Sequence, residues 1–103
     1  MISVSSEQIK NLLDQFDFER VHQHMSERPV WRWQLGSLLL VPTAMQLRTS
    51  AEMMLRGLVS TDDISKSCGG LRVSFLFNPT RLRLSFEDYR KGCTFSEQKE
   101  IDL

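Results

Sequence analysis

Two stretches in the second half of the chain alternate apolar and polar residues with a period of two. In Leu71–Phe77 the alternating apolar residues are leucine, valine and phenylalanine, and in Leu82–Phe86 leucine and phenylalanine alternate with arginine and serine. Residues 78–80, which read Asn-Pro-Thr, separate the two stretches and are typical of a turn. The pattern predicts a β-hairpin with one apolar face. Because other apolar elements must cover such a face, the hairpin limits the fold more than any other feature.

Two short helices are expected near the N-terminus. Ser5 and Gln8 have the spacing of a capping box and apolar residues follow at helical intervals, which predicts a helix over Ser6–Gln15. Asp17 is placed to cap a second helix that carries a short apolar stripe. This second helix should end at the residue before Pro29, because a residue that precedes proline disfavours the α conformation.

The middle of the chain contains a candidate strand and the clearest candidate helix. Trp31–Leu35 alternates tryptophan and leucine with polar residues, which predicts a half-buried strand. The apolar run Leu38–Val41 fits either a continuation of this strand past a bulge or turn, or a buried loop. Thr43 and Gln46 again have capping-box spacing, and they open a predicted helix that extends over about Ala44–Val59.

The order of these elements predicts an α+β fold. Helices should pack on one face of a small, mainly antiparallel three-stranded sheet, in the order α-α-β-α-β-β. The sheet would consist of Trp31–Leu35 and the two strands of the hairpin. Residues 1–87 are expected to form a single domain, and residues 88–103 a polar C-terminal tail or short helix with Tyr89 and Phe95 as candidate anchors.

The composition is that of an ordinary globular domain, with 41% hydrophobic residues, 25% charged residues and a net charge of zero. Zero net charge removes the overall attraction to DNA or anionic lipid, so such a role would need a local patch. Met1–Lys10 lacks the basic start and apolar core of a signal peptide, and no apolar run is long enough to cross a membrane. Cys68 and Cys93 provide neither a disulfide framework nor a four-ligand zinc pattern. We therefore expect a cytoplasmic protein with reduced thiols.

A series of short motifs gives the chain a family likeness. The motifs are Asp17-Phe18-Glu19-Arg20-Val21-His22, Met25, Trp31-x-Trp33, Val41-Pro42-Thr43, Leu47, Ala51, Leu55, Cys68-Gly69-Gly70-Leu71 and Leu82-x-Leu84-x-Phe86. Over Asp17–Phe86 the chain resembles a loose group of small uncharacterised proteins encoded by phages and prophages. The resemblance implies a phage or prophage origin and brings no known function with it. The stretch Gln34–Leu40 is longer and more apolar than the short polar link expected in that group.

Few residues form a pattern that indicates catalysis or metal binding. His22 and His24 are two residues apart on a predicted helix, so their side chains diverge by about 200° and cannot share a metal. Cys68 precedes two glycines and fits either a nucleophile on a turn or, as we favour, a small buried residue. Trp31 and Trp33 share a strand face and fit either core packing, which we favour, or stacking on bases or a ligand ring. We expect no catalytic residue, cofactor or metal.

A group of arginines forms a candidate face for an anionic partner. Arg32, Arg72, Arg81 and Arg83 all fall on the predicted solvent face of the sheet, where guanidinium groups can bind phosphates or an acidic protein. The same residues fit a solvated face whose arginines protect the sheet edges, and we favour this interpretation. The acidic residues within 87–102 are candidate neutralisers in the same chain.

These features together favour a binding role over an enzymatic one. We expect a small non-enzymatic protein, of phage or prophage origin, that acts by binding another protein. The alternative is a nucleic-acid-binding accessory protein that uses the arginine face. The sequence leaves open which partner is bound and whether the chain forms homo-oligomers.

Overall fold

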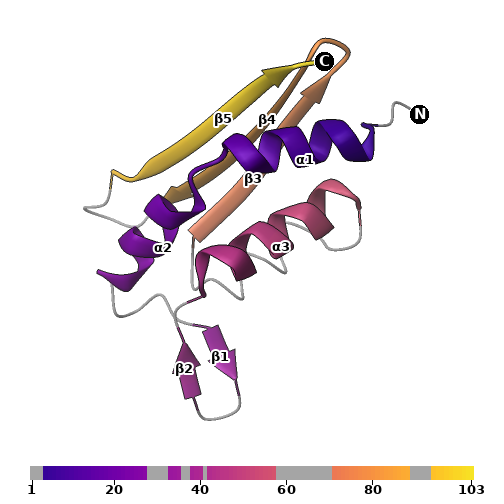
Figure 1. Cartoon of the computed structure of the whole chain (residues 1–103). Helices are drawn as coiled ribbons and strands as arrows, with labels where there is room; N and C mark the ends of the chain where they lie inside the picture. The colour runs from indigo at the N-terminus through magenta and orange to yellow at the C-terminus, as the bar shows by residue number, and fades with distance from the viewer. Residues whose placement is uncertain (1–3, 28–32, 36–37, 41, 58–70, 89–93) are drawn as a thin grey trace.

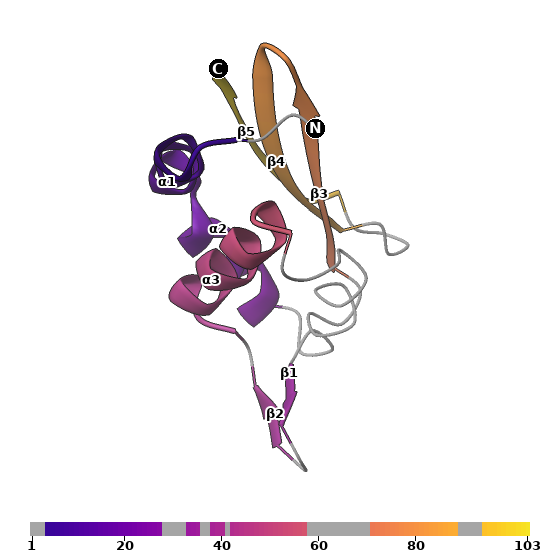
Figure 2. The same cartoon turned by 90° about the vertical axis from the view of Figure 1, so that its right-hand side faces the viewer.

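The computed structural model describes residues 4–27, 33–35, 38–40, 42–57, 71–88 and 94–103. In chain order its elements are α1 (Ser6–Gln15), α2 (Phe18–Ser26), β1 (Trp33–Leu35), β2 (Leu38–Leu40), α3 (Ala44–Leu55), β3 (Leu71–Asn78), β4 (Arg81–Asp88) and β5 (Ser96–Asp102). The helices lie on one side of a three-stranded antiparallel sheet with the order β3-β4-β5 (Figures 1 and 2). The predicted α+β fold, with helices on one face of a small antiparallel sheet, is confirmed.

The third strand of the main sheet is β5 and not the segment around the tryptophans. β4 lies in the centre and pairs antiparallel with β3 on one side and β5 on the other. β1 pairs with β2, with Trp33 opposite Leu40, in a separate hairpin that projects away from the main sheet (Figures 1 and 2). The expectation that the tryptophan strand joins the hairpin strands is therefore wrong. Of the two alternatives for the apolar run, the continuation past a turn is the one observed, because Leu38–Leu40 forms β2 and pairs with β1. Trp31 lies outside the described residues, as does the side chain of Trp33.

The expectation of a polar tail or short helix over residues 88–103 is also wrong, because Ser96–Asp102 forms β5. The register with β4 places Glu97, Lys99 and Ile101 on the face that the helices cover. Of these three side chains only Ile101 is buried. Since β5 is an edge strand with a mostly polar inner face, it lacks the alternation of apolar residues by which a strand is recognised in a sequence.

The core lies between the helices and the inner face of the sheet. α1 packs on β4 and β5, whereas α3 packs on α1 and α2. Phe16, Phe18 and Phe86 form an aromatic cluster in which ring centroids lie 4.6 to 6.1 Å apart. Among the described residues, the other apolar side chains of this core are those of Ile9, Leu12, Leu13, Val21, Met25, Leu47, Ala51, Met54, Leu71, Val73, Leu82, Leu84 and Ile101. Leu55 and Phe95 are partly buried and pack against this core.

The predicted capping residues determine where the helices begin. α1 and α3 start with complete capping boxes at Ser5 and Thr43, and the Asp17 side chain accepts a hydrogen bond from a backbone N–H in the first turn of α2. α3 ends at Leu55, a few residues earlier than expected. The cause is Gly57, whose φ of 76° lies in the left-handed region that glycine adopts readily and that terminates helices.

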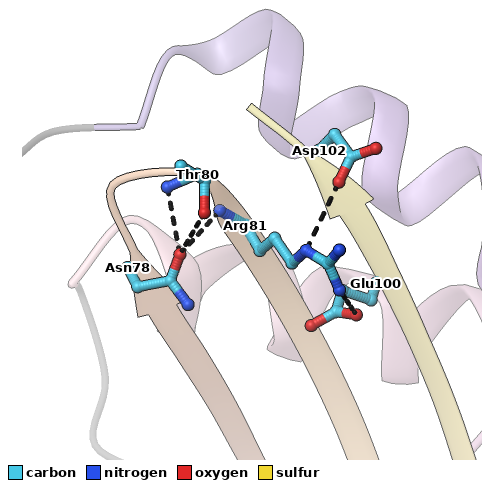
Figure 3. A network of polar contacts seen from close by, with 5 residues as sticks. All are labelled: Asn78, Thr80, Arg81, Glu100 and Asp102. Atoms are coloured by element: carbon cyan, nitrogen blue, oxygen red, sulfur yellow. Dashed lines mark hydrogen bonds and ion pairs between the residues drawn. The ribbon is translucent and has the colours of Figure 1, made fainter.

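The turn between β3 and β4 is built around the side chain of Asn78 (Figure 3). Its Oδ1 atom accepts hydrogen bonds from the backbone N–H of Thr80 at 3.0 Å, from the Thr80 hydroxyl at 3.1 Å and from the backbone N–H of Arg81 at 2.8 Å. The backbone N–H of Leu103 donates to the Thr80 carbonyl at 2.8 Å. The turn therefore fixes the register of the hairpin and also holds the end of β5.

Candidate interaction surface

The outward face of the main sheet carries opposite charges in register. The directly opposed pairs are Arg72 and Glu87, Arg83 and Glu100, and Arg81 and Asp102. The three arginines in these pairs lie on one face, as the sequence predicts, and each has a carboxylate residue directly across from it on a neighbouring strand. Opposed charges at such positions attract one another, so this face neutralises much of its own positive charge.

Arg81 shows how this neutralisation works in detail (Figure 3). Its Nη1 atom lies 3.2 Å from Glu100 Oε2, and its Nε atom lies 3.5 Å from Asp102 Oδ1. One guanidinium therefore contacts two carboxylates of β5. Arg32, the fourth expected member of the arginine face, lies outside the described residues. The described part of this face carries equal numbers of arginines and opposed acids, and it has no excess of positive charge with which to attract phosphates.

Loss of the Arg81 contacts should have a small effect on stability. The Arg81 side chain is 56% exposed, and exposed ion pairs contribute about 0.2 to 1 kcal/mol. We expect Arg81→Ala to lower the free energy of unfolding by less than about 1 kcal/mol in urea denaturation. A double-mutant cycle with Glu100→Ala measures the coupling directly. A coupling energy above about 2 kcal/mol would show that the pair is more than a solvated surface contact.

The two histidines contact different parts of the fold. His22 Nδ1 lies 2.6 Å from the carbonyl oxygen of the buried Pro42, so this nitrogen carries the proton and donates it. The bond connects α2 to the start of α3. His24 Nε2 lies 3.4 Å from Asp88 Oδ2 at the end of β4. The imidazole of His22 is therefore held by a backbone carbonyl, and that of His24 by a carboxylate.

His24 belongs to a cluster that attaches α2 to the start of β5. Its ring stacks on that of Phe95, with centroids 3.9 Å apart and an interplanar angle of 10°. The guanidinium carbon of Arg20 lies 5.2 Å from the centre of the Phe95 ring, and Arg20 also pairs with Glu97. Asp88, the carboxylate partner of His24, has a fully buried side chain. Phe95 covers one face of the His24 ring, and the Nε2 atom of His24 lies near Asp88. The cluster therefore holds α2 against the end of β4 and the start of β5, which are distant in sequence.

The described part of the chain contains neither a cluster of metal ligands nor a helix able to cross a membrane. No three His, Cys, Asp or Glu side chains there gather closely enough to hold a metal ion. None of the described helices is both long and apolar enough to cross a bilayer. Cys68, the candidate nucleophile, and Cys93 both lie outside the described residues.

The edge strand β3 exposes large apolar side chains on both faces of the sheet. Phe75, on the inner face, is 42% exposed, and Leu76, on the outer face, is 44% exposed. The described helices pack mainly on β4, on β5 and on one another, and the Phe75 ring stays partly exposed. Among the described residues only β4 pairs with β3, so the opposite edge of β3 has no strand beside it (Figure 2). The segment 74–78 contains no charge, glycine or proline.

The two edges of the main sheet differ in a way that bears on recognition. β5, at one edge, carries Glu97, Lys99, Glu100 and Asp102, and charges of this kind discourage further strand pairing. β3, at the other edge, has Arg72 near its start and no other charged residue. An uncharged apolar edge strand is a template for another strand. We define residues 74–78 as the β3 edge segment, and it is the candidate interaction surface of this fold.

The sequence contains one signal for this surface that the alternation pattern conceals. Phe75, Leu76 and Phe77 are three consecutive apolar residues, and a strand cannot turn all three towards one side. Leu76 must therefore lie on the face opposite the core. A single apolar residue at an outward position of a predicted strand indicates an exposed patch, and here it lies in an edge strand.

Comparison of the chain with protein-family models, with curated proteins and with solved structures gave no significant match.

Proposed function

We propose that this chain is a non-enzymatic protein that acts in the cytoplasm by binding a protein partner through the β3 edge segment. The observation that carries the proposal is the exposure of Phe75 and Leu76 on opposite faces of an edge strand. An added strand would pair with the backbone of β3 and bring its own side chains over both of these residues. The phage or prophage origin implied by the resemblance belongs to the same proposal.

A protein partner fits this surface better than a nucleic acid does. Strand addition forms hydrogen bonds to the backbone along the edge of a sheet, and only a polypeptide supplies such a strand. Nucleic-acid binding needs an excess of positive charge along the contact surface. The outward face instead places Glu87, Glu100 and Asp102 opposite its arginines, which does not favour the nucleic-acid alternative.

A binding experiment with matched variants tests the proposal. Leu76→Glu introduces a charge at the β3 edge segment, and the new carboxylate lies opposite Arg83, so the fold should tolerate it. Met45→Glu is the control, because Met45 is 69% exposed on α3, away from the edge. We expect the wild type and Met45→Glu, but not Leu76→Glu, to retain the same partner from a bacterial cytoplasmic extract. Identical extract partners on all three proteins would contradict the proposal. So would the absence of any extract partner from a wild type that also does not self-associate.

A further inference from the structure

We propose that the partner of the β3 edge segment is a second copy of this chain. The two copies of β3 pair antiparallel about a two-fold axis, with Leu76 opposite Leu76 of the second copy. Each copy contributes its three-stranded sheet, and the two sheets become one continuous sheet. This inference rests on the proposed function, because it names the occupant of the same edge.

The sequence of the edge segment is compatible with its own reverse. Ser74-Phe75-Leu76-Phe77-Asn78 has the same order of residue types in both directions: small polar, phenylalanine, leucine, phenylalanine, small polar. Antiparallel pairing about a two-fold axis matches a strand with its own reverse, because the same patch serves on both copies. A segment with this symmetry therefore offers every residue a partner of matching kind, which an unrelated strand would do only by coincidence.

The side chains also meet on the correct faces of the sheet. The register with β4 places Phe75 and Phe77 on the inner face and Leu76 on the outer face. With Leu76 at the axis, each Phe75 lies opposite Phe77 of the second copy, and Ser74 opposite Asn78. A two-fold axis perpendicular to the sheet keeps the helices of both copies on one side. The two exposed side chains of the strand are thus covered by the equivalent strand.

The distribution of charge favours self-pairing at this edge over the other. No residue of 74–78 is charged, so self-pairing there opposes no like charges. Arg72 would lie across from the Thr80 turn of the second copy and far from the second Arg72. Self-pairing of β5 about its central residue would instead place Lys99 against Lys99, and like charges directly opposite each other are destabilising. A second copy can therefore add to the sheet at β3 and is disfavoured at β5.

The proposed dimer interface is small, so we expect its affinity to be low. Self-pairing over 74–78 involves fewer residues than the 20 to 30 a side of a typical stable interface. We therefore expect a dimer that dissociates on dilution. Its formation is measurable as the change in average mass with concentration, starting from a monomer of 12.0 kDa.

A charge-swap experiment by sedimentation equilibrium tests both the occupant and the register. The samples are the wild type, Leu76→Glu, Leu76→Lys, an equimolar mixture of these two variants, and Met45→Glu as the control. Each Leu76 variant alone places two like charges against each other at the axis, so we expect at least a tenfold weaker dimer. The mixture opposes Glu to Lys and should recover association, while Met45→Glu should dimerise like the wild type. Thermal unfolding of each variant confirms that it is folded.

Three outcomes would overturn the inference. A wild type that stays monomeric at the highest attainable concentration excludes the second copy as the occupant. Unchanged dimerisation of both Leu76 variants places the interface elsewhere, and a mixture that stays monomeric excludes a Leu76 to Leu76 contact. The proposed function is judged separately: a monomeric wild type that still retains an extract protein only when Leu76 is intact would leave partner binding standing and reject self-pairing.

Discussion

Replacement of Phe86 by alanine should lower the free energy of unfolding by about 3 to 5 kcal/mol, the range for emptying a buried phenylalanine site. Phe86 is fully buried on β4, the central strand of the sheet, and contacts the rings of Phe16 and Phe18. A domain of this size is typically stable by about 5 to 15 kcal/mol, so the loss would remove a large part of the total. Urea denaturation monitored by circular dichroism measures the change.

Phe75→Ala is the matched control for this experiment. Phe75 lies on the same face of the same sheet, one strand away from Phe86, and is 42% exposed. The same chemical change should there cost about 1 kcal/mol, because much of the ring is already in water and a smaller cavity forms. Equal losses for the two variants would mean that α1 does not cover β4 in preference to β3.

Replacement of Ile101 by aspartate should destabilise the fold by at least about 3 kcal/mol. Ile101 is 7% exposed and lies opposite Leu82 on the inner face of the sheet. The variant loses buried apolar surface and also places a carboxylate in an apolar site. The midpoint of thermal unfolding should fall accordingly, by well over 10 °C for a domain of this length.

Gln98→Asp provides the comparison for the Ile101 variant. It introduces the same charge on the same strand at an exposed position of the outer face. Its effect on stability should stay within about 0.5 kcal/mol, as for most surface substitutions. If both aspartate variants unfolded at the temperature of the wild type, residues 96–102 would not be a strand of the core.

The helices could be predicted well because their signals are local. The capping residues Ser5, Asp17 and Thr43 lie within a few residues of the backbone groups that they satisfy, so their spacing in the sequence is enough. The β3-β4 hairpin is local in the same sense. Its alternation determines the faces, and the side chain of Asn78 closes the turn within three residues.

The third strand of the main sheet could not be predicted, because its pairing depends on contacts between distant segments. β5 has a single buried apolar residue, Ile101, so its sequence resembles that of a polar tail. The tryptophan segment has the stronger strand pattern, yet β1 finds its partner a few residues away in β2. Strand pattern indicates that a segment is extended, and it does not identify the neighbour.

The candidate site was also only partly predictable. The alternation of β3 and β4 placed Arg72, Arg81 and Arg83 on one face, and the structure shows them there. Which carboxylate lies opposite each of them follows from the register of β5, which the sequence does not reveal. The β3 edge segment became recognisable once the strand order placed β3 at an edge.

The place of β5 in the chain has a consequence for how the protein folds during synthesis. β5 is the last of the described elements to emerge from the ribosome, and its contact with α2 joins Arg20 to Glu97, 77 residues apart. Until it arrives, β4 is an unprotected edge strand with one apolar face. Contacts of such long range close slowly, and exposed edges favour aggregation while they remain open. Before β5 is synthesised, both β3 and β4 are therefore exposed edge strands. Pairing with β5 covers the edge of β4 and leaves that of β3 as it was.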